Sequence, residues 1–221
     1  MGQGAKLEAL RRFVREATEC VGAIADEESL LEALRPRLGR LIRDDSWLPE
    51  SCAQAHPLYY RQYLLHCDPL ERFSVVSFVW GPQQRTPIHN HTVWGLVGVL
   101  RGAERSQPYA PDAQGWMRAI GAPHLVQAGE IETVSPRLGD VHAVANAQPD
   151  KVSISIHVYG ANIGAVPRQV YLEEREQEGD TGGGHKPRAR TFISGYSSAS
   201  LPNLWDRSGE HPATTGDARS A

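Results

Sequence analysis

The feature that most constrains the fold is a long series of short β-rich runs in the second part of the chain. From Arg72 to about Phe192, each run is separated from the next by Gly, Pro, Asn or Asp. Runs recurring about every 8–12 residues are typical of antiparallel sandwiches and barrels. No helical pattern alternates with them, which disfavours a doubly wound α/β fold. The candidate strands are 73–80, 92–100, 104–109, 116–119, 130–134, 141–146, 152–159 and 169–173.

The N-terminal part is helical in character. Apolar residues recur at spacings of three and four over 7–17 and again over 30–42, which predicts two amphipathic helices. Asp26 is placed to cap the second helix, and Pro36 predicts a kink or a break inside it. The tyrosines of 56–66 suggest a third helical stretch.

These patterns divide the chain into three parts of one domain. We expect an N-terminal helical segment over 1–68 and a β-barrel with a C-terminal extension over 69–205. Residues 206–221 are polar and aperiodic, and we expect a disordered tail there. Residues 191–204 are apolar enough to dock on the body of the domain.

Composition excludes several classes of protein. The chain has 221 residues and a net charge of −3, which argues against nucleic-acid binding. No apolar run approaches the ~20 residues of a membrane helix, and the N-terminus lacks the apolar core of a signal peptide. The three cysteines are odd in number and form no CxxC pair, so we expect a reducing, cytoplasmic setting.

The sharpest local motif is His89-Asn90-His91. In a strand, residues i and i+2 point to the same face, about 6.5–7 Å apart, so two imidazoles can converge on one metal ion. A lone HxH is weak evidence, because exposed strands and polar loops also produce it.

Residues 152–159 (VSISIHVY) alternate strictly between polar and apolar. Ser155, His157 and Tyr159 therefore share one face of a strand. One interpretation is an amphipathic strand with its polar face in water. The other is a hydrogen-bond relay, in which Ser155 orients His157 and His157 holds the Tyr159 hydroxyl toward a metal-bound substrate.

A wider layout surrounds the histidines: His89, His91, Gly95, Gly102, then Gly129, Pro136, Gly139, His142 and Asn146. It resembles the two signature motifs of the cupin superfamily, apart from one extra residue between Pro136 and Gly139. The resemblance implies a mainly β fold, a cupin-type antiparallel β-barrel (jelly roll) with the helical segment packed on it. It also implies a divalent metal on His89, His91 and His142. The alternative is that His142 is a packed core residue and the other two lie at the surface.

Cupins usually carry a carboxylate ligand where this chain has Gly95. The implied site is therefore three neutral imidazoles, which leave coordination positions open and do not by themselves select one metal. Together with Ser155, His157 and Tyr159, this set resembles the thiol dioxygenases, the family of cysteine dioxygenase. The text TPIHNHTVWGLVGVLRGAE and HVYGANIGAVPRQVY resembles the bacterial 3-mercaptopropionate dioxygenase branch in particular.

The resemblance implies a function. Fe(II), one per chain, would sit on the three histidines, with O₂ as co-substrate. Both oxygen atoms would be added to the sulfur of a small carboxylate thiol, most simply 3-mercaptopropionate, to give a sulfinic acid. Cysteine or mercaptosuccinate as substrate, or a non-catalytic metal-binding cupin, are the alternatives. The partner we expect is this small molecule, with no nucleic acid and no membrane.

The resemblance also assigns the substrate residues. Arg168 matches the arginine that pairs with the substrate carboxylate in the mercaptopropionate branch, and a guanidinium suits that role because it donates two parallel hydrogen bonds. Gln62 falls where the cysteine-specific enzymes use an arginine, although a shift of one residue would place Arg61 there. A surface salt bridge for Arg168 and a helix-surface amide for Gln62 are the alternatives. No cysteine stands at Gly95, so we predict no thioether crosslink to Tyr159.

Overall fold

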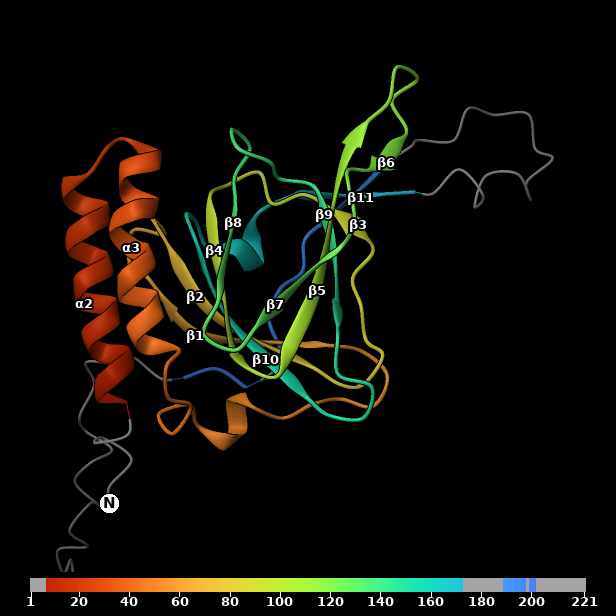
Figure 1. Ribbon diagram of the computed structural model, residues 1–221. Helices are drawn as coiled ribbons and strands as arrows, with labels where there is room; N and C mark the ends of the chain where they lie inside the picture. Colours follow the sequence, from red (N-terminus) through yellow and green to blue (C-terminus); the bar gives the residue numbers. More distant parts are fainter. Residues whose placement is uncertain (1–6, 173–188, 198, 202–221) are drawn as a thin grey trace, which may run out of the picture.

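A computed structural model describes residues 7–172, 189–197 and 199–201. Two helices, α2 (Glu8–Ala23) and α3 (Glu27–Leu41), lie side by side against one face of a β-barrel (Figure 1). A 3₁₀ turn, η1 (Glu50–Cys52), leads into the strands, and a second one, η2 (Ile163–Ala165), follows the strand Ser153–Tyr159. The two predicted helices are therefore present.

The second helix begins as its sequence predicts. The Asp26 side chain accepts the Ser29 N–H at 2.9 Å, and this satisfies a free backbone donor in the first turn. Helix α3 nevertheless runs through Pro36 without a break, so the predicted split is wrong. Leu34 and Leu38, on either side of Pro36, are fully buried. Their packing against the barrel offsets the backbone hydrogen bond that proline cannot make.

The strands form two curled antiparallel sheets. One sheet has the order β1-β2-β10-β4-β8, and the other has the order β12-β11-β3-β9-β5-β6, with β7 paired to β5. The bounds are β1 Arg61–Cys67, β2 Ser74–Trp80, β3 Ile88–His89, β4 Gly95–Arg101, β5 Ala103–Pro111, β6 Met117–Ala119, β7 His124–Gln127, β8 Ile131–Val134, β9 His142–Asn146, β10 Ser153–Tyr159, β11 Arg168–Tyr171 and β12 Ala189–Phe192. The predicted mainly β barrel with a helical segment on it is confirmed.

The predicted third helix is wrong, because residues 61–67 form β1. Its buried residues Tyr63 and Leu65 alternate with less buried ones, which is the period of a strand. Pairing with β2, from Arg61 opposite Val79 onward, decides the conformation of this stretch. Strands β3, β7 and β12 were also not predicted. They are two to four residues long and carry too few residues for a periodic pattern.

Strand β10 divides the interior of the protein into two parts. All seven of its residues are buried. Ile154, Ile156 and Val158 pack in the core that α2 and α3 cover, whereas Tyr159 packs with the residues inside the barrel. The polar face of this strand, which alternates with the apolar one, therefore lies within the barrel rather than in water, and the solvent-exposed interpretation is wrong.

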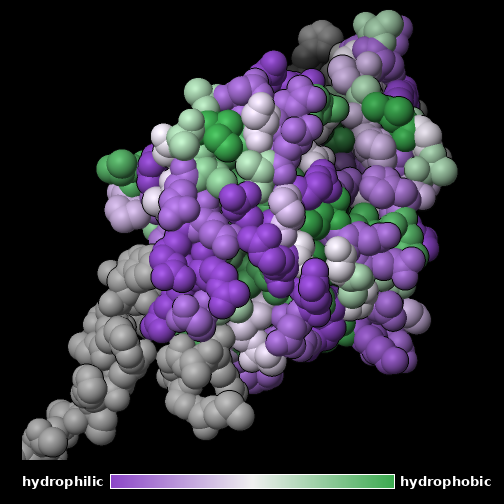
Figure 2. Space-filling view, turned by 60° about the vertical axis from the view of Figure 1, so that its left-hand side comes forward, coloured by the Kyte–Doolittle hydropathy of each residue, from purple (hydrophilic) through white to green (hydrophobic). Residues whose placement is uncertain are grey.

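The helices come close to the sheet at one glycine. A Cβ at Gly98 of β4 would lie 2.9 Å from Cδ1 of Ile42, at the end of α3. Figure 2 shows that the face with the helices in front is mainly hydrophilic, with hydrophobic residues scattered between. Neither helix of the described part is long and apolar enough to cross a membrane. The predicted tail, 206–221, lies outside the described residues.

Part of the C-terminal extension docks on the barrel, as predicted. Strand β12 pairs with β11, and beyond it the Leu201 N–H donates to the Leu64 carbonyl of β1 at 3.0 Å. We call residues 189–197 the C-terminal strap. It begins with β12, the outer strand beside β11, and reaches β1, the outer strand of the other sheet, through the contacts of Ser197 with Gln62.

Candidate metal centre

Three histidines from two neighbouring strands converge inside the barrel. His89 ends β3, His91 follows it two residues later, and His142 begins β9 directly opposite His89 in the sheet. One ligand atom from each residue lies within 4.8 Å of the others. The ring centroids are 4.8 to 5.0 Å apart in all three pairs. This arrangement can hold one metal ion.

The Nδ1 atom of each imidazole has its own partner, which leaves the Nε2 atoms for a metal. His89 Nδ1 lies 3.0 Å from the carbonyl oxygen of Pro87. His142 Nδ1 lies 3.3 Å from Ser106 Oγ, and Ser106 donates its own proton to Glu132 at 2.8 Å. Ser106 Oγ is thus free to accept from His142. Such partners fix the tautomer and the orientation of a metal-binding histidine.

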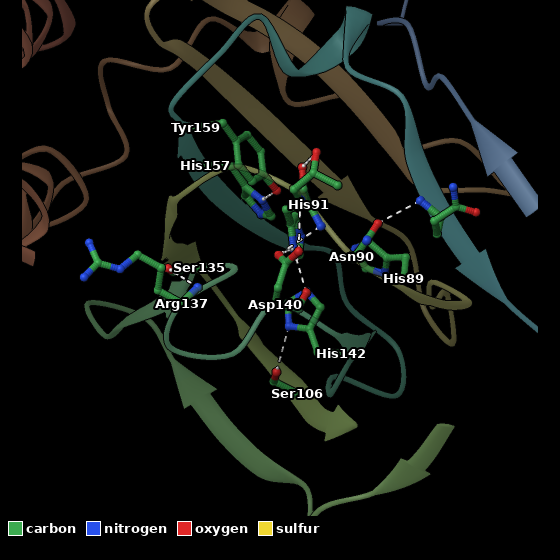
Figure 3. A network of polar contacts seen from close by, with 12 residues as sticks. His89, Asn90, His91, Ser106, Ser135, Arg137, Asp140, His142, His157 and Tyr159 are labelled. Atoms are coloured by element: carbon green, nitrogen blue, oxygen red, sulfur yellow. Dashed lines mark hydrogen bonds and ion pairs between the residues drawn. The ribbon is translucent and has the colours of Figure 1, made fainter. Parts of the chain in front are cut away.

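The third histidine, His91, is held by Asp140. The Asp140 Oδ1 lies 3.1 Å from His91 Nδ1 and also accepts the His91 backbone N–H at 2.9 Å (Figure 3). Its Oδ2 accepts the N–H of Thr92 at 2.9 Å. Thr92 has φ +61, a strained value for a β-branched residue. Asp140 therefore stabilises both the imidazole and the unusual backbone turn that aims it.

The electrostatics of the cluster suit a cation. Removal of the imidazole from water, and then the proximity of His91, lowers the pKa of His89 to about 3. Burial likewise holds the pKa of His142 well below its usual range. Both rings are therefore neutral at physiological pH and keep a lone pair for a metal. The donor set fits Fe(II), Zn(II) or another divalent ion that accepts imidazole.

A cavity of about 250 Å³ opens next to these histidines. Its lining brings together the side chains that the sequence singled out for chemistry: Gln62, His89, His91, His142, His157, Tyr159 and Arg168. Tyr60, Phe78 and Trp80 add an aromatic wall. The volume admits a small molecule of a few heavy atoms next to the metal position.

The relay between Ser155, His157 and Tyr159 is present in the structure. Ser155 Oγ lies 2.8 Å from His157 Nε2, and His157 Nδ1 lies 2.7 Å from the Tyr159 hydroxyl. Phe78 stacks on the His157 ring at 3.9 Å between centroids, which fixes its plane. Burial lowers the pKa of His157 well below its usual range and raises the pKa of Tyr159. Both groups are therefore neutral.

Gly95 lies against the tyrosine. A Cβ at this position would lie 2.7 Å from Cδ1 of Tyr159 and 2.9 Å from Cγ2 of Val134. The ring thus packs on bare backbone. The position that the resemblance equates with a crosslinking cysteine does border the Tyr159 ring, and here it carries no side chain.

Arg168 is a pocket residue rather than a surface one, since it is only 3% exposed. The C-terminal strap holds it in place. Its Nη2 donates to Ser194 Oγ at 2.5 Å, and its guanidinium carbon lies 4.6 Å from the centre of the Phe192 ring. Among the described residues its Nε has no hydrogen-bond partner, so the guanidinium keeps a free donor. The surface salt-bridge alternative is wrong.

Gln62 lines the cavity, whereas its neighbour Arg61 does not. The Arg61 guanidinium instead lies 5.9 Å from the centre of the Tyr59 ring. The strap holds the Gln62 backbone through two hydrogen bonds. The Ser197 N–H donates to the Gln62 carbonyl at 2.6 Å, and the Ser197 Oγ accepts the Gln62 N–H at 3.0 Å. The side-chain Oε1 of Gln62 is buried and has no partner among the described residues.

Sequence reasoning missed several residues of this site. Asp140 and Ser106 orient the histidines, and Phe192 and Ser194 hold the arginine. Asp140 stands two residues before His142, so in an extended chain the two side chains would lie on the same face. This spacing was the only sign in the sequence that Asp140 belongs to the site. The others come from distant segments, and no spacing connects them to the motifs.

No family model matches the chain. Among solved structures, a double-stranded β-helix protein from Klebsiella pneumoniae is 18% identical, with a TM-score of 0.41 over 52% of this chain and 88% of the other. A cupin superfamily protein from Desulfitobacterium hafniense is 11% identical, with a TM-score of 0.39 over 52% and 90%. An oxalate oxidase in complex with glycolate is 17% identical, with a TM-score of 0.39 over 54% and 61%.

Proposed function

We propose that this protein is an Fe(II)-dependent thiol dioxygenase that converts 3-mercaptopropionate and O₂ to 3-sulfinopropionate. The observation that carries the proposal is the content of one cavity. Three clustered histidines, the His157–Tyr159 end of a buried Ser-His-Tyr relay and a buried arginine with a free donor all line it. The histidines would hold the metal, the relay places a hydroxyl group at the cavity, and the arginine would bind the substrate carboxylate.

His89, His91 and His142 would hold the Fe(II). When bound, the ion would bring the thiol and dioxygen together and would favour the thiolate form of the substrate. Three protein ligands would leave room for both at the ion. The reaction RS⁻ + O₂ → RSO₂⁻ takes all four electrons from sulfur, so no external reductant is required.

The residues of the chain then supply binding and orientation. Arg168, already desolvated and held by Phe192 and Ser194, binds the carboxylate without having to be ordered at that moment. Gln62 offers a polar side chain at the same cavity. The Tyr159 hydroxyl, held by His157, lies at the cavity and can form a hydrogen bond with a bound substrate. Tyr60, Phe78 and Trp80 give this space an aromatic wall.

The size and charge of the site favour an acid substrate. Cysteamine has no carboxylate and would leave the buried guanidinium unpaired, which is costly. Mercaptosuccinate has a second carboxylate and requires a second cation. Among the described residues that line the cavity, Arg168 is the one arginine or lysine, so a monocarboxylate matches best. The absence of Arg61 from the cavity supports the mercaptopropionate branch over the cysteine-specific one.

The test is oxygen uptake by the Fe(II)-loaded protein, with sulfinate quantified, across 3-mercaptopropionate, cysteine, mercaptosuccinate and cysteamine. We expect one sulfinate per O₂ and the highest kcat/KM for 3-mercaptopropionate. A preference for another thiol would overturn the substrate assignment and keep the reaction. No uptake with any thiol, despite bound iron, would overturn the dioxygenase and leave a metal-binding protein.

A further inference from the structure

Ser106 of β5 lies between two histidines, one at the metal centre and one at the surface. Strand β5 pairs with β9 on one side, where His142 is two positions from Ser106, and with β7 on the other side, where His124 is directly opposite Ser106. Side chains at such positions share one face of a sheet. The His124 side chain is half exposed, whereas Ser106 and His142 are buried. This face of the sheet therefore connects solvent with the metal centre.

Glu132 approaches this face from the other sheet. It belongs to β8, which lies at the edge of the five-stranded sheet. Its Oε1 accepts the Ser106 hydroxyl proton at 2.8 Å and lies 3.2 Å from His124 Nε2. Ser106 Oγ in turn lies 3.3 Å from His142 Nδ1 (Figure 3). The contacts therefore form a continuous series of four side chains, His124, Glu132, Ser106 and His142.

The proton of the Ser106 hydroxyl determines where His142 carries its own proton. A hydroxyl has one proton, and Ser106 donates it to Glu132. Toward His142, Ser106 Oγ can therefore only accept, and the proton of the ring must lie on Nδ1. Burial holds the pKa of His142 well below its usual range, so the ring is neutral and has a single N–H. Its Nε2 then keeps the lone pair that binds a metal.

The carboxylate, rather than the serine alone, sets this direction. An ionised carboxylate has no proton to donate, so its contact with Ser106 has one polarity. Without an acceptor at position 132, the Ser106 hydroxyl can turn and donate to His142 Nδ1. The ring proton must then lie on Nε2, where it occupies the lone pair needed for the metal. The contacts of Glu132 therefore affect a metal ligand that it does not touch.

We propose that Glu132 is a positioning residue of the metal centre, which acts through Ser106 to keep the His142 proton on Nδ1 and the Nε2 lone pair available to the metal. His124 holds the carboxylate from the solvent side. The inference rests on the metal site of the function proposed above. It applies to any divalent ion bound there and requires neither the thiol nor dioxygen.

The first test reads the tautomer of His142 in metal-free protein at neutral pH. Two-bond ¹⁵N–¹H correlations with ¹⁵N-labelled histidine distinguish Nδ1–H from Nε2–H, and the His142 signals are those lost in His142→Gln. We expect Nδ1–H in the unsubstituted protein and Nε2–H in Glu132→Leu. Glu130→Leu, the same change at an exposed carboxylate, should keep Nδ1–H. An unchanged tautomer in Glu132→Leu, or Nε2–H in the unsubstituted protein, would overturn the proposal.

The other two histidines of the cluster are controls within the same spectra. His89 Nδ1 faces the Pro87 carbonyl, and His91 Nδ1 faces Asp140. Neither contact involves Glu132, so both rings should keep Nδ1–H when Glu132 is replaced. A change of tautomer in all three rings would show a general disturbance of the site, and the positioning role would be lost.

Zn(II) affinity gives a second readout, measured by competition with a chelator. Loss of a group that orients a metal ligand typically reduces affinity by about 10–100-fold. We expect this loss in Glu132→Leu and an unchanged affinity in Glu130→Leu. Equal affinities in the two variants would contradict the proposal.

If Glu132→Leu does not fold, Ser106→Ala provides the alternative test. It retains the carboxylate but removes the atom that accepts from His142 Nδ1. His142 should then carry its proton on Nε2, and a retained Nδ1–H would contradict us. These measurements use neither thiol nor dioxygen, so their result is independent of whether sulfinate is formed.

Discussion

The Asp140 carboxylate holds His91 at two points, at the backbone N–H (2.9 Å) and at the imidazole Nδ1 (3.1 Å). The Asp140 backbone carbonyl also lies 3.1 Å from His91 Nδ1, so this one residue fixes both the backbone and the ring orientation of His91. Loss of a group that orients a metal ligand typically reduces metal affinity by about 10–100-fold. We expect Asp140→Asn to weaken Fe(II) binding by this factor, measured by competition with a chelator. Asp150→Asn, at an exposed position, is the matched control. Equal affinities for both variants would contradict the orienting role.

The second prediction concerns the ligand set. His142→Ala removes one of three donors, and we expect it to abolish stoichiometric Fe(II) or Zn(II) binding, measured by metal analysis after dialysis. His56→Ala is the control, because the His56 ring stacks on Tyr59 outside the cavity. Full metal occupancy in His142→Ala would remove this residue from the site.

The third prediction concerns the arginine and the strap that holds it. Arg168→Ala should weaken binding of 3-mercaptopropionate by about 2–5 kcal/mol, because a buried charge pair is lost. The loss should lower kcat/KM mainly through a higher KM. Cysteamine, which has no carboxylate, should be affected far less. Ser194→Ala and Phe192→Leu should also affect 3-mercaptopropionate more than cysteamine, but the losses should be smaller. Ser194 and Phe192 only position the guanidinium. Equal losses for both thiols would argue against a carboxylate clamp.

The fourth prediction concerns the contact below Tyr159. Gly95→Ala would place a Cβ 2.7 Å from the tyrosine ring and should destabilise the fold by about 1–3 kcal/mol, as overpacking does. Gly39→Ala in α3 meets only an ordinary contact at 3.8 Å, and it should stabilise by about 0.5–1 kcal/mol because alanine favours a helix. Urea unfolding of both variants measures the difference. The same sign for both would show that the close contact at Gly95 relaxes.

The fifth prediction is a pH dependence of stability far from the cavity. Hydrogen bonds from the Arg72 side chain, the largest cause, lower the pKa of Asp68 to about 2. Because the pKa is lower in the folded protein than in the unfolded chain, the stabilisation is present above about pH 4 and is lost as the pH falls toward 2. Asp68→Asn should therefore lower the free energy of unfolding at pH 7 by about 2 kcal/mol. The gap between the two proteins should close in acid, and a constant gap would refute the assignment.

The sequence predicted the elements whose residues follow a periodic pattern within one stretch of chain. The strict alternation of 152–159 predicted β10, and the spacing of leucines predicted α3. The HxH motif and the layout around His142 predicted the cluster. Whether the polar face of β10 met water or the barrel interior depended on the helices that cover its other face. That packing joins residues far apart in the chain.

The remaining features depend on pairing between distant segments. Residues 61–67 form a strand because β2 lies beside them, and the partner is not visible in the stretch itself. Ser194 and Phe192 reach Arg168 because β12 pairs with β11, and neither residue has a distinctive spacing.

Strand β3 has two residues, and it is the connection between β9 and β11 in the seven-stranded sheet. The edge that carries Arg168 and the strap is therefore attached to the rest of that sheet through the backbone of His89, a residue of the candidate metal centre. The Asn90 side chain adds to this attachment, because it accepts the Gln169 N–H at 2.7 Å. The two ends of the cavity are mechanically linked. Restraining His89 at one end should slow amide exchange along β11 and β12 at the other.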